Sequence, residues 1–208
     1  MTTPYLAHST AELIEWVVKD YIPKGYYFYA PGLTPHDDDP VEFDREILDQ
    51  IEASKWALHG QKGQADVQYL RFNRLFLIAA TEGFLSFLPD QAERIKDIRK
   101  TSLGIDGHEI NCLRSRGGKC RASVRIHPEY FAAMMEKYVR LAATSSAEDL
   151  GIYLLRLGRA LYPTVREELG IVLQAVNRKR KVAGLEIVPR TAIGLKQAPV
   201  KPFKPKVQ

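Results

Sequence analysis

Apolar residues that recur every three or four positions predict two helices near the start of the chain. The first is expected over residues 10–21, with Thr10 as its N-cap, and the second over residues 42–51. The side chains expected to face inward are Leu13, Trp16, Val17, Tyr21, Phe43, Ile47, Leu48 and Ile51. Between the helices, the aromatic segment 25–30 predicts a strand, and the Pro- and Gly-containing segment 31–40 predicts a loop.

Short apolar runs in the middle of the chain predict a series of strands. Three follow one another at residues 67–72, 74–81 and 83–89, and residues 90–99 predict a short helix. Trp56 lies in an ambiguous segment just before them, and we expect its large ring to find a packing partner.

The clearest local signal is a β-hairpin over residues 108–126. A Gly-Gly pair at 117–118 lies at its centre, and both glycines can take the positive φ that a two-residue turn requires. With that turn, Cys112 is expected opposite Ser123, and Cys120 on the other face of the hairpin.

Three helices are expected after the hairpin. A proline opens the helix over 128–143, a capping box that begins at Ser145 precedes the helix over 146–161, and a third helix covers 164–182. The apolar stripe of the third helix comprises Val165, Leu169, Val172, Leu173 and Val176. Residues 185–208 contain four prolines and little apolar periodicity, so we expect a mostly extended or disordered tail.

This order of elements predicts an α+β protein, because strands followed by a run of helices are typical of that class. An N-terminal antiparallel sheet with helices is expected over residues 1–126, and the hairpin 108–126 is its last element. A C-terminal helical subdomain of about three helices is expected over residues 127–184. An extended basic tail over residues 185–208 completes the chain.

Charge divides the chain into an acidic and a basic half. The 208 residues carry a formal net charge of +5. Residues 1–100 contain 11 basic and 16 acidic residues, whereas residues 101–208 contain 19 basic and 9 acidic residues. Such asymmetry is typical of a protein whose basic half meets a polyanion, either nucleic acid or an anionic membrane surface.

Two basic clusters in the second half indicate nucleic acid as the partner, with DNA favoured over RNA. The residues expected to contact phosphates are Arg114, Arg116, Lys119, Arg121, Arg178, Lys179, Arg180 and Lys181. The last two helices also permit a helix-turn-helix, in which Arg166, Gln174 and Asn177 occupy non-apolar positions. Glu167 and Glu168 lie where such a recognition helix enters DNA, so phosphate contact is favoured over base reading.

An acidic loop is the most enzyme-like segment of the chain. His36, Asp37, Asp38 and Asp39 are consecutive, and clustered carboxylates bind Mg²⁺ in many phosphodiester-cleaving enzymes. Consecutive side chains cannot all reach one ion, however, and Asp39 is also placed to cap the helix that follows. A metal-dependent nuclease with His36, Asp37 and Asp39 in its site is the alternative hypothesis, and Mg²⁺ is expected as a cofactor only in that case.

The tyrosines of segment 25–30 offer a second route to phosphodiester chemistry. The hydroxyl of Tyr27 or Tyr29 is a candidate nucleophile, and exposed rings at these positions are candidates for stacking on unpaired bases. Packing in the core or across strands is the simpler expectation, because alternate residues of a half-buried strand face inward.

No other catalytic, cofactor or metal motif is found in the sequence. His108, Cys112, Cys120 and His127 have the residue types of a zinc site, but the expected hairpin register separates them, so no metal is predicted. Neither a signal peptide nor a long apolar run is found, so we expect a cytoplasmic protein with no membrane span and with free thiols. A third hypothesis, a protein–protein interaction module, rests on the charge asymmetry alone.

Overall fold

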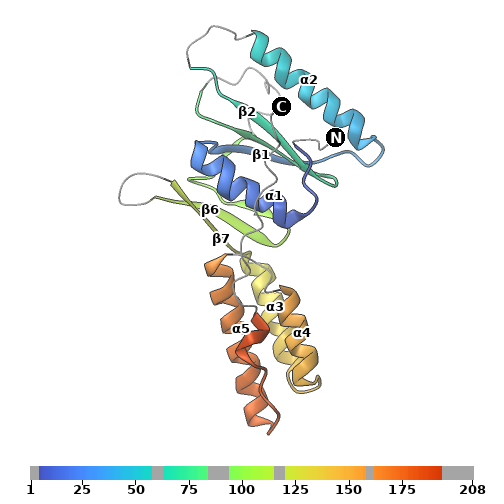
Figure 1. Ribbon diagram of the computed structural model, residues 1–208, viewed down its shortest axis with the longest axis vertical. Helices are drawn as coiled ribbons and strands as arrows, with labels where there is room; N and C mark the ends of the chain where they lie inside the picture. The colour runs from blue at the N-terminus through green and yellow to red at the C-terminus, as the bar shows by residue number, and fades with distance from the viewer. Residues whose placement is uncertain (1–4, 58–62, 84–93, 115–119, 158–161, 194–208) are drawn as a thin grey trace, which may run out of the picture. The chain divides into compact units, whose positions relative to one another are not determined.

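The protein has the α+β fold that the sequence predicts. The computed structural model describes residues 5–57, 63–83, 94–114, 120–157 and 162–193. These residues form five α-helices and two antiparallel sheets, and three of the helices follow the sheets along the chain (Figure 1). The chain divides into two compact units, Met1–Ser123 and Val124–Gln208.

The N-terminal helix is less regular than the sequence predicts. α1 (Thr10–Trp16) follows Ser9, whose Oγ accepts a hydrogen bond from the backbone N–H of Glu12 at 3.1 Å. The N-cap is therefore one residue earlier than predicted. The chain continues through a π-helical turn, Val17–Tyr21, and a 3-10 turn, Ile22–Lys24. The predicted helix is thus correct in extent but not in regularity.

The first sheet has four strands in the order β2-β3-β1-β4. Their bounds are β1 Phe28–Leu33, β2 Val67–Phe72, β3 Leu75–Ala80 and β4 Lys96–Asp97. β1 runs into the predicted loop because Pro31 and Gly32 pair with β3, and Pro31 lies beyond the residues that β4 covers. A Cβ on Gly32 would collide with the ring of its cross-strand partner Phe76. β4 replaces the helix predicted over 90–99, and residues 84–93 lie outside the described part of the chain.

α2 (Pro40–Ala57) covers one face of this sheet (Figure 1). Asp39 caps the helix as predicted, because its Oδ1 accepts a hydrogen bond from the backbone N–H of Val41 at 3.0 Å. The buried residues between helix and sheet are Ala30, Ile47, Ile51, Val67, Tyr69, Phe76, Ile78 and Ala80. Trp56, near the end of the helix, is 76% exposed and therefore lies outside the core between helix and sheet.

The second sheet contains the predicted hairpin and one strand that was not predicted. Its strands lie in the order β5-β6-β7, with bounds β5 Leu103–Ile105, β6 His108–Arg114 and β7 Cys120–Ile126. Asp106 and Gly107 connect β5 to β6, and both have positive φ, as a two-residue hairpin turn requires. An Asp-Gly pair between apolar residues is a strong hairpin signal, so the sequence does encode β5.

The hairpin of β6 and β7 has a different register from the one predicted. Cys112 and Cys120 form a disulfide, and their Cα atoms lie 5.4 Å apart, as opposed residues of an antiparallel pair do. Cys112 is expected opposite Ser123, so the pairing is displaced by three residues, and the expectation of free thiols is also wrong. Residues 115–119, with the predicted turn, lie outside the described residues.

Three helices make up most of the second unit (Figure 1). Their bounds are α3 Pro128–Leu141, α4 Ala147–Leu157 and α5 Pro163–Val182. Ser146 caps α4, one residue later than predicted, because its Oγ accepts a hydrogen bond from the backbone N–H of Asp149 at 3.0 Å. The predicted apolar stripe of α5 is buried at every position: Val165, Leu169, Val172, Leu173 and Val176.

The end of α5 is a Schellman motif. Gly184 has a φ of 68°, and its N–H donates to the carbonyl of Lys181 at 3.1 Å. The N–H of Leu185 donates to the carbonyl of Arg180 at 2.9 Å. Glycine suits this position because it takes positive φ without steric cost.

The segment that follows α5 belongs to the fold. Residues 185–193 run back along the helix and end in a short 3-10 helix, η4 (Arg190–Ile193). Val188 and Ile193 are buried, so this first part of the predicted tail packs on the second unit. Residues 194–208 lie outside the described part of the chain.

Candidate nucleic-acid interface

An open groove runs along α5 in the second unit. One wall is the helix, and the other is the segment 187–193 that folds back beside it. Two adjoining hollows, of about 640 and 560 Å³, make up the groove. They share the lining residues Gly170, Gln174, Arg190 and Ile193. Pro163 lines one end and Lys181 the other, so the groove follows almost the whole helix.

The sequence of α5 separates a buried apolar stripe from a polar row that faces the groove. Arg166, Gly170, Gln174 and Arg178 are spaced four residues apart and therefore lie on one side of the helix. Lys181 follows three residues after Arg178 on the same side. The apolar stripe is buried in the second unit, and this burial turns the polar row outward.

Positive charge dominates the groove. Four of its described lining residues are cationic: Arg166, Arg178, Lys181 and Arg190. Glu167 is the one acidic residue among the lining residues that the structure describes. The sequence of the second unit contains 15 Lys and Arg against seven Asp and Glu. The groove therefore favours an anionic ligand.

One polar side chain of α5, Asn177, holds the second wall of the groove in place, and another, Arg180, ties the helix to the connection between α3 and α4. The carboxamide of Asn177 donates from Nδ2 to the carbonyl of Val188 at 2.9 Å, and its Oδ1 accepts from the Val188 N–H at 2.8 Å. Arg180 donates from Nη1 to the carbonyls of Ala142 at 2.9 Å and Ser145 at 2.8 Å. These bonds satisfy backbone groups that would otherwise be buried without partners.

The cluster at the helix end, predicted to contact phosphates, is split by the structure. Arg178, Lys179 and Lys181 are exposed, and the first and last of these line the groove. Arg180 is only 3% exposed, and its Nε donates a further hydrogen bond to the carbonyl of Glu186. Contrary to the prediction, Arg180 is not placed to contact an external phosphate, because it lies on the buried side of α5.

The other predicted cluster belongs to the hairpin. Arg121 is exposed on β7. Arg114 is the last residue of β6, and its side chain lies outside the described part of the structure, as do Arg116 and Lys119. The groove is complete without this cluster, so the groove defines the candidate interface.

The acidic loop does not gather its carboxylates into a described site. His36 and Asp37 are exposed, and Asp39 is engaged as the N-cap of α2. Asp44, further along α2, is buried and paired with Arg71. Among the described residues, no group of three or more His, Cys, Asp or Glu is placed to hold a metal ion.

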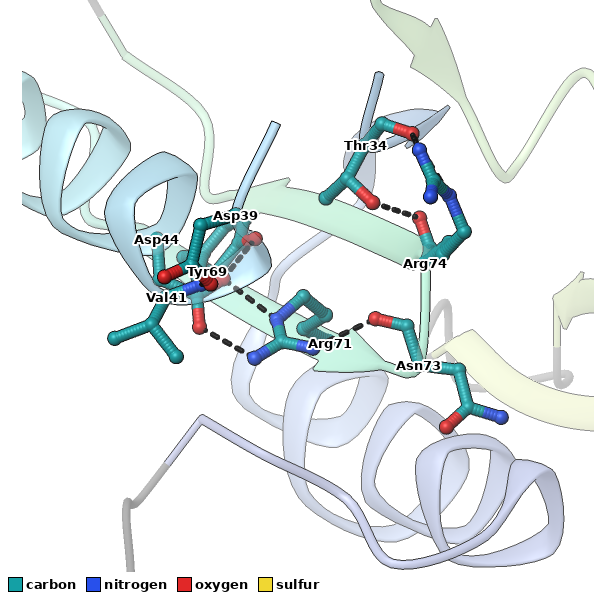
Figure 2. A network of polar contacts seen from close by, with 8 residues as sticks. All are labelled: Thr34, Asp39, Val41, Asp44, Tyr69, Arg71, Asn73 and Arg74. Atoms are coloured by element: carbon teal, nitrogen blue, oxygen red, sulfur yellow. Dashed lines mark hydrogen bonds and ion pairs between the residues drawn. The ribbon is translucent and has the colours of Figure 1, made fainter. Parts of the chain in front are cut away.

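Asp44 and Arg71 form a buried ion pair in the first unit (Figure 2). Arg71 donates from Nε to Asp44 Oδ1 at 2.6 Å and from Nη2 to Oδ2 at 2.7 Å, and its Nη1 donates to the carbonyl of Asn73 at 2.6 Å. The Tyr69 hydroxyl also donates to Oδ1, at 2.7 Å. Burial and this carboxylate raise the pKa of Tyr69 well above its usual range. The network joins α2 to β2, so these charges serve the fold.

Tyr29 is a core residue and not an available nucleophile. Its hydroxyl donates hydrogen bonds to the carbonyls of Thr101 at 3.0 Å and Ser102 at 2.7 Å. Burial raises the pKa of Tyr29 to about 12, so its phenolate does not form near neutral pH. The guanidinium carbon of Arg99 lies 4.8 Å from the ring centroid of Tyr27, so one face of that ring is already covered.

Two parts of the groove escape prediction from the sequence. Arg190 belongs to the basic tail that the sequence predicts as part of the nucleic-acid surface, but its place beside α5 is not predicted, although the neighbouring residues Ile187, Val188 and Ile193 signal a packed segment. Gly170 gives no functional signal by itself, although a glycine inside a helix is unfavourable and calls for a reason.

Comparison with known proteins finds no matching family model, no matching curated protein and no matching solved structure. Within the described part of the chain, none of the helices combines the length and apolar character that crossing a bilayer requires. The candidate function therefore rests on the groove itself.

Proposed function

We propose that the protein binds nucleic acid through the groove along α5, with DNA as the favoured form. The observation that carries this proposal is the set of four cationic side chains around one groove: Arg166, Arg178, Lys181 and Arg190. Phosphate groups are the anions that nucleic acid presents in a row, and a row of cations along a helix matches that repetition.

The three arginines suit phosphate particularly well. A guanidinium group offers several N–H donors in a fixed plane, so it can bind two oxygens of one phosphate at once. Lys181 adds a point charge at one end of the groove. Four phosphate contacts predict a log–log salt slope of about −3.6 for a DNA duplex and about −2.8 for a single strand.

The exposed Arg121 supports a second basic surface on the hairpin. With Arg114, Arg116 and Lys119, it forms a cluster of like charge in the sequence. In the proposal, this cluster contributes additional phosphate contacts, and Arg121→Ala tests that contribution apart from the groove.

The test is a binding titration by fluorescence anisotropy with labelled single-stranded DNA, duplex DNA and RNA at several salt concentrations. Arg178→Ala/Lys181→Ala should weaken binding at least tenfold and reduce the salt slope by about two, because each lost phosphate contact lowers it by about one. Lys179→Ala is the matched control, since Lys179 is an exposed cation of the same helix that does not line the groove.

The outcomes separate the hypotheses. No binding to any nucleic acid at low salt would overturn the proposal, and equal effects of the two variants would move the binding surface away from the groove. Samples with and without Mg²⁺ are also checked for cleavage, because Mg²⁺-dependent cleavage would favour the alternative class of metal-dependent nucleases.

A further inference from the structure

Gly170 lies inside α5 without a structural reason that the fold supplies. Its neighbours on both sides belong to the same 20-residue helix. A Cβ built on Gly170 meets nothing within 4 Å, and its φ is not in the left-handed region. Glycine is the least favourable residue in a helix interior after proline, so alanine would suit the fold better.

The position of Gly170 in the groove offers a reason. It lies one helical step from Arg166 on one side and from Gln174 on the other, and both adjoining hollows include it. Each step of four residues advances about 6 Å along the helix axis. The missing side chain therefore leaves the helix wall of the groove open midway along its row of polar side chains.

The groove is concave, and this shape discriminates between forms of nucleic acid. A helix that reads duplex DNA must protrude so that it enters the major groove. The polar row of α5 is instead flanked by the segment 187–193, so it forms one wall of a trough. A duplex can touch the rims of this trough through its phosphates, whereas a single strand can lie inside it.

The walls of the groove also offer apolar surface. Ile187 lines the groove beside Arg178 and Lys181, and it is 47% exposed. Unpaired bases have apolar faces that a duplex hides by stacking. Cations beside an exposed aliphatic side chain therefore fit a ligand that carries both phosphates and unstacked bases.

We propose that the groove takes a single strand of nucleic acid in preference to a duplex, and that Gly170 admits the strand to the helix wall between Arg166 and Gln174. The inference rests on the proposed nucleic-acid binding and specifies its substrate. The phosphates lie toward the cationic rim, and a base or sugar lies against the open helix surface at Gly170.

The experiment compares a labelled 20-nucleotide single strand with the duplex of the same sequence, on the full chain and on a graded pair of variants, Gly170→Ala and Gly170→Leu. The wild-type chain should bind the single strand at least tenfold more tightly than the duplex. Gly170→Leu should weaken single-strand binding at least tenfold and duplex binding by a smaller factor, because only the strand reaches the helix wall at this position. Gly170→Ala should have a smaller effect in the same direction.

Thermal unfolding provides the folding control. Both variants should unfold at the same temperature as the wild-type chain or at a higher one, because alanine and leucine are better helix formers than glycine. Gln174→Ala gives a second measurement that adds no bulk, and it should weaken single-strand binding more than duplex binding.

The results distinguish the two levels of the proposal. If the wild-type chain binds neither form, nucleic-acid binding itself is wrong. If it binds both forms and Arg178→Ala/Lys181→Ala weakens both, nucleic-acid binding stands. In that case, equal affinities for strand and duplex, or a Gly170→Leu variant that binds the strand as the wild type does, would overturn the single-strand inference.

Discussion

The side chain of Asn177 and the backbone of Val188 are joined by two hydrogen bonds, one in each direction. The carboxamide thus pairs with the peptide group much as a neighbouring strand would. This pair fixes the segment that forms the second wall of the groove, although Asn177 itself looks from the sequence like a base-reading residue of α5.

Asn177→Ala should release that wall. The free energy of unfolding should fall by about 1–3 kcal/mol, because two hydrogen bonds are lost and both polar groups of Val188 lose their partner. Trypsin should cleave the variant faster after Arg190 than it cleaves the wild-type chain. Asn177→Asp can accept a hydrogen bond from Val188 but cannot donate one, so its cleavage rate should lie between those of the wild-type chain and Asn177→Ala. An unchanged cleavage rate for Asn177→Ala would show that Asn177 does not hold this segment in place.

Substitution by alanine should change the free energy of unfolding much more at Arg180 than at its neighbour Lys179. Arg180→Ala should lower the free energy of unfolding by about 3 kcal/mol, because it leaves buried carbonyls without their charged donor. Lys179→Ala, at an exposed site, should change it by less than about 0.5 kcal/mol. Chemical denaturation of the two variants measures the contrast, and similar values would show that Arg180 is not a structural residue.

Removal of either partner of the Asp44–Arg71 ion pair should destabilise the protein strongly. Asp44→Ala or Arg71→Ala should lower the free energy of unfolding by about 3–5 kcal/mol, because each leaves the other charge buried and unpaired. The double variant Asp44→Ala/Arg71→Ala should lower the free energy of unfolding by less than the sum of the two single changes. A double-mutant cycle by urea denaturation checks this, and additive effects would argue against direct coupling.

The disulfide between Cys112 and Cys120 should stabilise the hairpin formed by β6 and β7. The double variant Cys112→Ser/Cys120→Ser should lower the free energy of unfolding by about 2.5 kcal/mol, because the bond closes a short loop and restricts the unfolded chain. Intact mass after treatment with an alkylating reagent, with and without prior reduction, shows directly whether the thiols are bonded. Two alkylated cysteines before reduction would disprove the pairing.

Tyr29 should make the first unit sensitive to high pH. Its pKa is raised to about 12 by burial, from about 10 for a free tyrosine, so its contribution to stability is complete below pH 10. That contribution should be lost as the pH rises from about 10 to about 12. Unfolding midpoints across this range should fall more steeply for the wild-type chain than for Tyr29→Phe; parallel curves would assign the alkaline loss to other groups.

Local rules in the sequence were sufficient for the elements whose signals are short in range. Apolar periodicity located α5 and its buried stripe, and Asp39 could be identified as the cap of α2 from its position before the helix. The Asp106-Gly107 turn is encoded by its two residues in the same local way. In each case, the residues that form the feature are neighbours along the chain, so their preferences act without help from the rest of the fold.

Other features depended on contacts between distant residues. Pro31 and Gly32 read as a loop, yet they belong to a strand, because β3 supplies the partner and the ring of Phe76 covers the glycine. The predicted register of the β6–β7 hairpin was also wrong, because strand pairing depends on the whole sheet and on the bond between Cys112 and Cys120.

The candidate interface shows the same division. The sequence by itself determined the α+β class, the helical repeat of α5 and the excess of positive charge near the C-terminus. Only the tertiary structure decided which cations are available, because burial withdrew Arg180 and the folding back of residues 185–193 brought Arg190 opposite Arg166 and Arg178. The physical reason is that charge is a property of each residue, whereas a groove exists only when two segments pack and leave space between them.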